Sequence, residues 1–197
     1  MKKIVIASLF VLLMMGFTTG GAQAYSFNIY NNYTAWLSAI APSASINENF
    51  EDTTLVSGFS ITEINGAGSI HDGVYENIVD KDANRYQVFN YANMKAWGGF
   101  LDLKNPGGAG TGINVFINDD NTLLFNVPNT VEGQFVGIVL TGSGSFNGIR
   151  FEDAAGAGIQ ETYYSIDMSM ATVPEPATML LLGLGLFGIG IASRKKS

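Results

Sequence analysis

The chain has 197 residues, a formal net charge of −7 at pH 7 and no cysteine. This length suits one domain of ordinary size, and the lack of cysteine excludes disulfides, thiolate catalysis and cysteine metal sites. Once the two terminal segments described below are set aside, sixteen acidic and five basic residues remain, a net charge of −11. Such a surface repels phosphate groups, so we expect no nucleic-acid partner.

The first 24 residues have the pattern of a secretory signal peptide. Lys2 and Lys3 precede an apolar stretch, and Ala22 and Ala24 form a small-residue cleavage site before Tyr25. The sequence therefore predicts export with cleavage before Tyr25. An uncleaved anchor helix is the alternative, which the short apolar stretch disfavours.

A short amphipathic helix is predicted at the start of the mature chain. Apolar residues recur at helical spacing from Tyr33 to Ile40, after Asn31 and Asn32 as capping candidates and before Pro42. We expect this helix to pack on a larger unit.

Short apolar segments separated by Gly, Asn and Asp follow from residue 46 onward. They are typical of strands, and several alternate between apolar and polar residues. The segments are 46–50, 59–64, 75–79, 86–91, 99–103, 112–117, 122–127, 135–140, 146–152 and 161–170. The pattern predicts a mainly β fold, an antiparallel β-sandwich of the jelly-roll type with one short N-terminal helix; a closed barrel is the alternative.

Catalytic groups are scarce in the sequence. His71 is the single histidine and lies in a turn-like HDG segment, and no nucleophile elbow is present. Paired carboxylates for glycoside hydrolysis need a defined separation across a cleft, which the sequence does not specify. We therefore predict a protein that is not an enzyme, with a small secreted glycoside hydrolase as the least favoured alternative.

An acidic segment places Asp80, Asp82 and Asn84 at the spacing with which a calcium loop begins. Arg85 at the sixth position and Tyr91 at the twelfth exclude an EF-hand, which requires glycine and glutamate there. A solvated acidic turn is the favoured interpretation, and a looser calcium site is the alternative.

Aromatic residues cluster between residues 86 and 100. Flat rings can stack on sugar faces while neighbouring amides bind hydroxyl groups, so this segment is a candidate carbohydrate site. The candidate binding residues are Tyr91, Asn93 and Trp97, within a cluster that also contains Tyr86, Phe89 and Phe100. The competing and favoured interpretation is that these rings form the core.

The C-terminal segment, 173–197, combines three features. A proline-flanked glutamate precedes an uncharged run over 177–193, which is at the short limit for a membrane span. Basic residues then predict a cytoplasmic end. The residues concerned are Val173, Pro174, Glu175, Pro176, Ala177 and Thr178 in the first part and Arg194, Lys195 and Lys196 in the last. We predict a transmembrane helix here, with the domain outside the cytoplasm.

This tail strongly resembles the PEP-CTERM sorting signal of Gram-negative bacteria. The resemblance implies recognition by an exosortase, a membrane-embedded cysteine transpeptidase-like protease, and cleavage near the Pro-Glu-Pro motif. It further implies release or transfer of the domain to the outer surface, and an association with exopolysaccharide and biofilm or floc formation. The tail departs from the usual pattern at Lys195 and Lys196, where arginines are more common.

The middle of the chain has a second resemblance. The segment NENFED at 47–52, SGF at 57–59 and YYSIDMSM at 163–170 are similar to the first and last strands of galactose-binding-like carbohydrate-binding jelly rolls. In that family, carboxylates on these strands help to hold a structural calcium ion. The resemblance implies that Glu51 and Asp167 take this role, and calcium is the one cofactor that the sequence raises.

Together these features predict three parts: a signal peptide at 1–24, a secreted β-sandwich domain at 25–172 and a sorting signal at 173–197. We expect an exported protein at the outer cell surface or in the extracellular matrix. Its expected partners are an exosortase, the membrane through its tail, and exopolysaccharide or other glycans. A sugar-binding or matrix module is the leading function, and a structural or adhesive coat protein without a ligand site is the alternative.

Overall fold

The computed structural model describes residues 26–41, 43, 45–105, 112–118, 121–154 and 160–172. The predicted signal peptide, with its cleavage site at Ala22, Ala24 and Tyr25, and the predicted sorting signal at 173–197 lie outside these residues. None of the described residues belongs to a helix with the length and apolarity of a membrane span.

Eleven strands and one helix make up the described part of the chain. In chain order these are β1 (Phe27–Tyr30), α2 (Tyr33–Ile40), β2 (Ser45–Glu48), β3 (Ser60–Ile64), β4 (Ser69–His71), β5 (Val74–Asp80), β6 (Tyr86–Asp102), β7 (Ile113–Ile117), β8 (Thr122–Val127), β9 (Gln134–Leu140), β10 (Phe146–Asp153) and β11 (Gln160–Thr172). All strand pairs are antiparallel. The predicted mainly β fold, an antiparallel sandwich of the jelly-roll type with one short helix, is confirmed.

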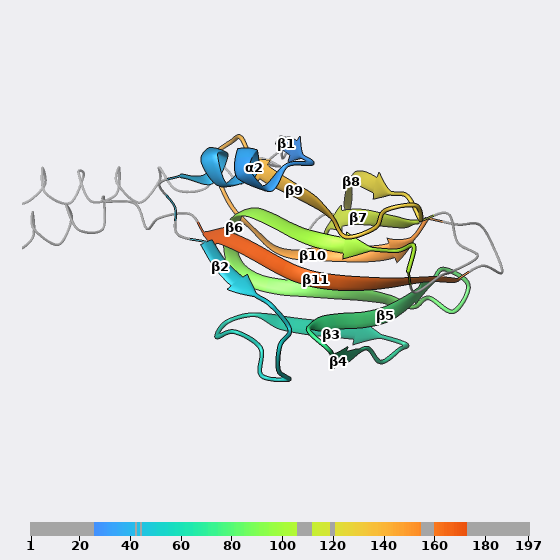
Figure 1. Ribbon diagram of the computed structural model, residues 1–197. Coiled ribbons are helices and arrows are strands. Elements are labelled where there is room, and N and C mark those ends of the chain that lie inside the picture. Colours follow the sequence, from blue (N-terminus) through green and yellow to red (C-terminus); the bar gives the residue numbers. More distant parts are fainter. Residues whose placement is uncertain are drawn as a thin grey trace, which may run out of the picture.

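The long strand β6 belongs to both layers of the sandwich (Figure 1). Its first half, 86–90, pairs with β3 and β10, and its second half, 96–101, pairs with β9 and β11. The first layer, called sheet A here, therefore has the order β3-β6-β10-β7-β8. The second layer, sheet B, contains the second half of β6 together with β11, β9, β1, β2, β5 and β4.

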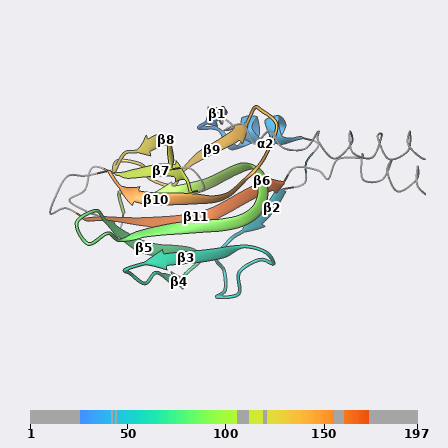
Figure 2. The ribbon, with the colours of Figure 1, turned by 180° about the vertical axis from the view of Figure 1, so that it is seen from behind.

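Strand β11 divides its edge in a similar way. Residues 160–165 pair with β5 and residues 168–171 pair with β2, while the opposite edge of β11 pairs with β6 (Figure 2). The end of β11 is therefore held on both sides within sheet B.

The sequence predicted two strands where the structure has the single strand β6. Gly98 and Gly99 suggested a break, but Gly98 lies under the ring of Phe135 on the neighbouring strand. A Cβ atom at Gly98 would lie 2.5 Å from Cζ of Phe135, so the glycine makes room for the ring instead of ending the strand. The short strands β1 and β4 were not predicted.

Aromatic rings fill the space between the two sheets. Phe89 and Phe151 from sheet A meet edge to face at 4.9 Å, and Phe151 contacts Trp97 of sheet B at 5.7 Å. Tyr163 of β11 contacts Phe151 at 5.3 Å. These four side chains are at most 1% exposed, and such buried ring pairs stabilise a core beyond their area alone.

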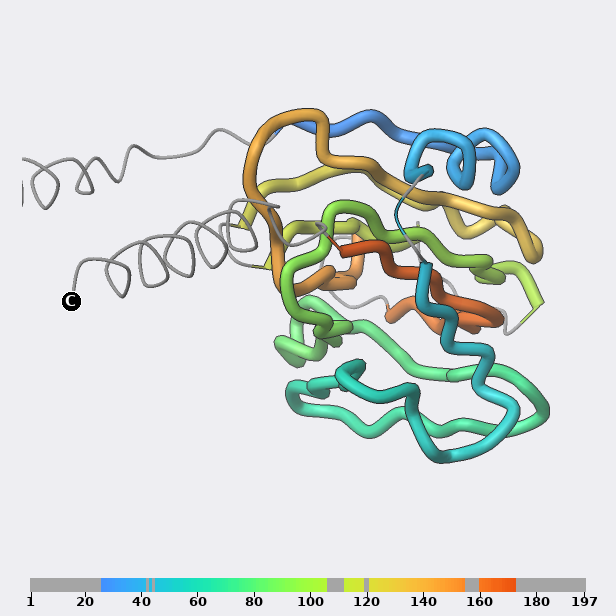
Figure 3. Tube along the Cα trace, turned by 90° about the vertical axis from the view of Figure 1, so that its left-hand side faces the viewer, coloured from blue at the N-terminus to red at the C-terminus, as the bar shows by residue number. Residues whose placement is uncertain are grey.

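Helix α2 forms a second, smaller core on the outer face of sheet B (Figure 3). The predicted cap is confirmed, because the Asn32 side chain accepts a hydrogen bond from the Ala35 N–H at 2.9 Å. Trp36 is fully buried against Phe135, and its indole Nε1 donates to the carbonyl of Ile138 at 3.1 Å. The helix is thus fixed to β9 by both packing and a hydrogen bond.

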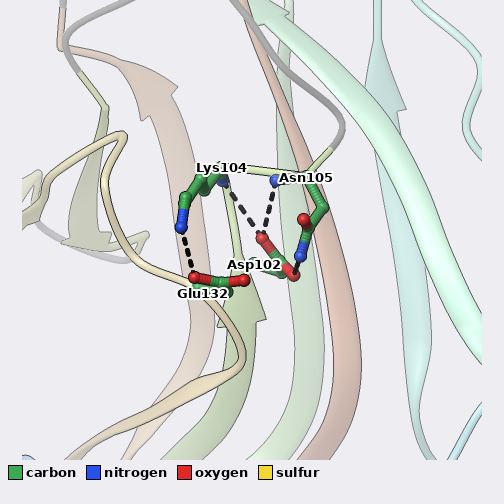
Figure 4. A network of polar contacts seen from close by, with 4 residues as sticks. All are labelled: Asp102, Lys104, Asn105 and Glu132. Atoms are coloured by element: carbon green, nitrogen blue, oxygen red, sulfur yellow. Dashed lines mark hydrogen bonds and ion pairs between the residues drawn. The ribbon is translucent and has the colours of Figure 1, made fainter.

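Strand β6 ends in a turn that Asp102 holds (Figure 4). One carboxylate oxygen of Asp102 accepts from the backbone N–H groups of Lys104, at 3.1 Å, and Asn105, at 3.0 Å. The other oxygen accepts from the Asn105 side chain. Lys104 also pairs with Glu132 at 2.5 Å, but both side chains are more than half exposed, so this ion pair contributes little to stability.

Replacing Trp36 with alanine should lower the free energy of unfolding by roughly 3–5 kcal/mol, because it opens a cavity under α2 and leaves the Ile138 carbonyl without its donor. Urea unfolding followed by circular dichroism measures this change. Ile29→Ala is the control, because Ile29 is 55% exposed and its loss should change stability by less than about 0.5 kcal/mol. Equal effects of the two substitutions would contradict the packing described for α2.

Candidate functional site

The outer face of sheet A carries a continuous row of side chains. Ile149 and Phe151 of β10 point into the core, so Arg150 between them points outward. Its partners across the neighbouring strands are Val88 of β6 and Phe116 of β7, and Phe116 in turn lies opposite Leu123 of β8. Leu123 is 54% exposed, so the row ends in an apolar side chain open to solvent.

Arg150 lies at the centre of this face between two aromatic rings. Its guanidinium carbon is 4.8 Å from the ring centre of Phe116 and 5.7 Å from that of Tyr86. Its Nε is 2.7 Å from Glu152 Oε1, and Nη1 donates to Asn121 Oδ1 at 2.6 Å. Cation–π contacts and two polar partners hold the planar group in one orientation. We call Tyr86, Phe116, Asn121, Arg150 and Glu152 the Arg150 platform.

Amide and hydroxyl groups surround the platform. On one side, Asn126 of β8 donates to the Ile113 carbonyl at 3.2 Å and to Asn114 Oδ1 at 3.4 Å. On the other side, Asn90 of β6 donates to Thr62 Oγ1 of β3 at 3.0 Å. The face therefore combines flat apolar rings with many neutral hydrogen-bonding groups.

A small pocket adjoins the platform at Tyr86 and Glu152. Its volume is about 60 Å³, enough for a few water molecules. It is lined by Asp80, Lys81, Asn84, Arg85, Tyr86, Glu152 and Asp153.

Two buried carboxyl groups interact at this edge of the platform: Asp153, which lines the pocket, and Glu161. Glu161 of β11 is fully buried, and its Oε2 accepts from the Gly112 N–H at 2.9 Å. Asp153 of β10 is 4% exposed. Burial raises the pKa of Glu161, the Gly112 hydrogen bond lowers it in part, and the negative charge of Asp153 raises it again. Glu161 therefore holds its proton to a higher pH than an exposed glutamate.

The structure separates the aromatic residues that the sequence grouped together. Trp97 is fully buried between the sheets, so for this ring the favoured interpretation as core is confirmed and the alternative of sugar binding at the surface is wrong. Tyr91 packs against the core, and its ring lies beside Gly58. Asn93 is exposed at the bend of β6, where its N–H donates to Asn147 Oδ1 at 3.0 Å. These three residues do not form one surface.

The structure does bring Glu51 and Asp167 close together. Burial raises the pKa of Asp167, and the negative charge of Glu51 raises it further. A calcium ion takes about six to eight oxygen ligands, whereas within the described ranges no three His, Cys, Asp or Glu side chains gather in a way that could hold a metal. The calcium ion that the resemblance implies at Glu51 and Asp167 stays a prediction.

The acidic segment from Asp80 forms the turn between β5 and β6. Asp80 Oδ1 accepts from the backbone N–H groups of Asp82, at 2.9 Å, and Ala83, at 3.2 Å, and Asp80 also exchanges two backbone hydrogen bonds with Arg85. Asn84 adopts a left-handed backbone with φ of 49°. Asp80 therefore acts as a turn cap, which agrees with the interpretation as an acidic turn.

His71 lies on the exposed hairpin of β4 and β5, away from the Arg150 platform. Its Nε2 is 2.8 Å from Glu76 Oε2, and its ring meets Tyr164 edge to face at 6.3 Å. The side chain is 41% exposed. The prediction of an exposed turn histidine is confirmed.

Sequence reasoning missed most of the platform. Of its members, Tyr86 was within the aromatic cluster, but Phe116, Asn121, Arg150 and Glu152 were not singled out. A usable signal was present in 149–152, because the alternation of Ile149 and Phe151 with Arg150 and Glu152 predicts two charged side chains on the outer face. Their meeting with Phe116 and Asn121 depends on strand order, which the sequence pattern does not specify.

Comparison with known proteins concerns the two parts of the chain separately. Residues 172–196 match the PEP-CTERM protein-sorting motif. The match confirms the sorting motif predicted from the tail, and it indicates an exported protein. The sorting motif begins at the last residue of β11. No curated protein matches the sequence.

Solved structures with a similar backbone include family 29 carbohydrate-binding modules. The module from Piromyces equi has a TM-score of 0.42 and 13% identity, and covers 77% of this chain and 93% of its own. Two single-residue mutants of the module CBM29-2 have TM-scores of 0.47 and 0.48 and identities of 11% and 10%. Each covers 68% of this chain, and 98% and 99% of its own length, respectively.

Replacing Glu161 with glutamine should raise the melting temperature at neutral pH by a few degrees. Because the pKa of Glu161 is higher in the folded state than in the unfolded state, protonation of Glu161 stabilises the fold. This stabilisation is fully present below the unfolded pKa of about 4.3 and is lost as pH rises through the folded pKa. Glutamine keeps an acceptor for Gly112 without a charge beside Asp153. Thermal unfolding between about pH 4 and pH 8 measures the difference, which should vanish at the acidic end.

The matched control is Glu132→Gln, because Glu132 is 52% exposed and lies in a surface ion pair. Its melting temperature should differ little from that of the unchanged protein at any pH. A pH-independent gain for Glu161→Gln would contradict the raised pKa.

Proposed function

We propose that this protein is exported, processed by an exosortase at its sorting motif, and retained at the cell surface or in the matrix, where its sandwich domain binds polysaccharide through the Arg150 platform. The observation that carries the binding proposal is the position of Arg150 between Tyr86 and Phe116 on the outer face of sheet A, where its side chain is 12% exposed. The processing proposal rests on the motif at 172–196.

The platform has the composition that sugar recognition requires. A sugar ring has apolar C–H faces and a rim of hydroxyl groups, so it pairs with aromatic rings and with planar hydrogen-bonding groups. Phe116, Tyr86 and the exposed Leu123 supply the first kind of contact, while Arg150, Glu152 and Asn121 supply the second. Since the row of side chains runs across β6, β10, β7 and β8 to the exposed Leu123, it suits a chain of sugars more than a single small ligand.

The same contacts favour binding over hydrolysis. A glycoside hydrolase places an acid and a second carboxyl group on opposite sides of the bond to be cleaved. At the platform, Glu152 is already paired with Arg150, and Asp153 next to it is buried. A non-catalytic module is therefore the function that this geometry supports best.

Replacing Arg150 with alanine should weaken polysaccharide binding at least about tenfold, which is roughly 1.4 kcal/mol, because both polar contacts and the ordering of the two rings are lost. Pull-down on the exopolysaccharide of the producing cells, together with a glycan array, measures this. Arg150→Lys separates shape from charge, because lysine keeps the charge without the planar fork and should also bind weakly.

Lys104→Ala is the matched control for the loss of a cation. Lys104 is 57% exposed and pairs with Glu132 in the turn after β6, so binding should be unchanged. If the unchanged protein binds no glycan, or if Arg150→Ala and Arg150→Lys both bind glycan as well as the unchanged protein does, the platform is not a sugar site. The domain would then be better described as a coat protein without a ligand site.

Alanine at Pro174, Glu175 and Pro176 should abolish conversion of the precursor to the shorter mature form, because these three residues form the Pro-Glu-Pro part of the matched sorting motif. Immunoblots of whole cells and culture medium measure the ratio of the two forms. Alanine at Ser38, an exposed helix residue, is the control and should leave this ratio unchanged. Normal processing of the triple variant would exclude the motif as the cleavage signal.

A further inference from the structure

The folded domain leads into the sorting motif without a linker. The motif match begins at residue 172, and Thr172 is the last residue of β11. Thr172 pairs with Met94 of β6, and Ala171 before it is fully buried and pairs with both Ala96 and Ser45. The chain is therefore fixed in sheet B up to the residue at which the motif begins.

The short connection limits how far the domain can lie from a membrane that holds the tail. Four residues, 173–176, lie between Thr172 and Ala177, where the uncharged run begins, and the five residue-to-residue steps span at most about 17 Å. The end of the sandwich from which β11 leaves must then lie next to the lipid surface. The opposite end, at the turn between β5 and β6, lies a strand length farther away (Figure 1).

Five segments meet at this end of the sandwich. Thr141 N–H donates to the Ser26 carbonyl at 2.8 Å, the Lys95 ammonium group contacts the Gly142 carbonyl, and Asn93 N–H donates to Asn147. The last residues of β11 join these segments by pairing with β2 and β6. We call this surface the β11 end; it consists of Ser26, Ser45, residues 91–95, residues 141–147 and Thr172.

The β11 end differs in charge from the rest of the domain. The stretches 26–47, 88–101, 133–151 and 168–172, which supply it, contain no Asp or Glu. Lys95 is the charged residue within the surface as defined, while the sixteen acidic residues of the domain lie in other stretches of the chain. The five segments of the β11 end thus contain no acidic residue, in a domain of net charge −11. The loop between β2 and β3, which carries Glu51 and Asp52, reaches this end at Gly58, beside Tyr91. The tail leaves from the same end.

We propose that the β11 end docks on anionic lipid headgroups while the sorting motif is still attached. An anionic membrane repels acidic groups that come within a Debye length, roughly 8–10 Å, and the five segments of the β11 end contain none. Lys95 adds a favourable charge, and the Ser, Thr, Asn and Gly residues of the end suit a hydrated headgroup layer. This inference rests on the membrane tail of the proposed function, but not on sugar binding.

The lack of cysteine allows a direct test with single-cysteine labels on the full chain. The chain is inserted into vesicles of phosphatidylethanolamine and phosphatidylglycerol that carry a quencher on the lipid headgroup. A fluorophore at Ser143→Cys reports on the β11 end, and one at Lys81→Cys reports on the opposite end; both positions are exposed. We expect several-fold stronger quenching at Ser143→Cys. Equal quenching at the two positions would overturn the docking.

The role of charge is tested by adding acidic groups to the same end. The variant Ser26→Glu with Gly142→Glu places two carboxylates there, and a Cβ at Gly142 meets no atom within 4 Å, so the fold has room for it. Quenching at Ser143→Cys should fall on anionic vesicles and stay unchanged on phosphatidylcholine vesicles. An equal fall on both would refute the charge argument. If neither label is quenched on any vesicle, the membrane tail itself fails, which is a distinct result.

Discussion

The backbone hydrogen bonds of β6 run in both sheets, and the positions of the other elements depend on this. Its first half pairs with β3 and β10, and its second half pairs with β9 and β11. The bend between the halves includes Asn93, whose φ of 57° asparagine tolerates better than most residues, and its N–H is bound by Asn147. The bend therefore fixes where sheet A ends and sheet B begins.

The two candidate surfaces follow from the course of β6. Its start carries Tyr86 onto the outer face of sheet A beside Arg150, and its bend contributes residues 91–95 to the β11 end. Phe89 and Trp97 of the same strand point inward. Both rings contact Phe151 in the core between the two sheets. One strand thus joins the candidate sugar site, the core and the end proposed to face the membrane.

Local patterns in the sequence were sufficient for the elements but not for the site. The helix spacing and the Asn32 cap predicted α2, and apolar alternation predicted most strands, because these signals involve residues a few positions apart. The exposure of Trp97 could not be predicted in this way, since the same ring suits a core or a surface. The contact of Arg150 with Phe116 also depends on β7 lying beside β10, a pairing of segments about thirty residues apart.

The distribution of charge and the direction of the strands permit both proposed interactions at once. The strands run between the β11 end and the opposite end, so the outer face of sheet A lies to the side when the β11 end meets the lipid (Figure 1). The guanidinium of Arg150 is balanced by Glu152, so the platform adds little net charge to this face. A polysaccharide could therefore bind before or after release of the domain, because docking covers neither Tyr86 nor Phe116.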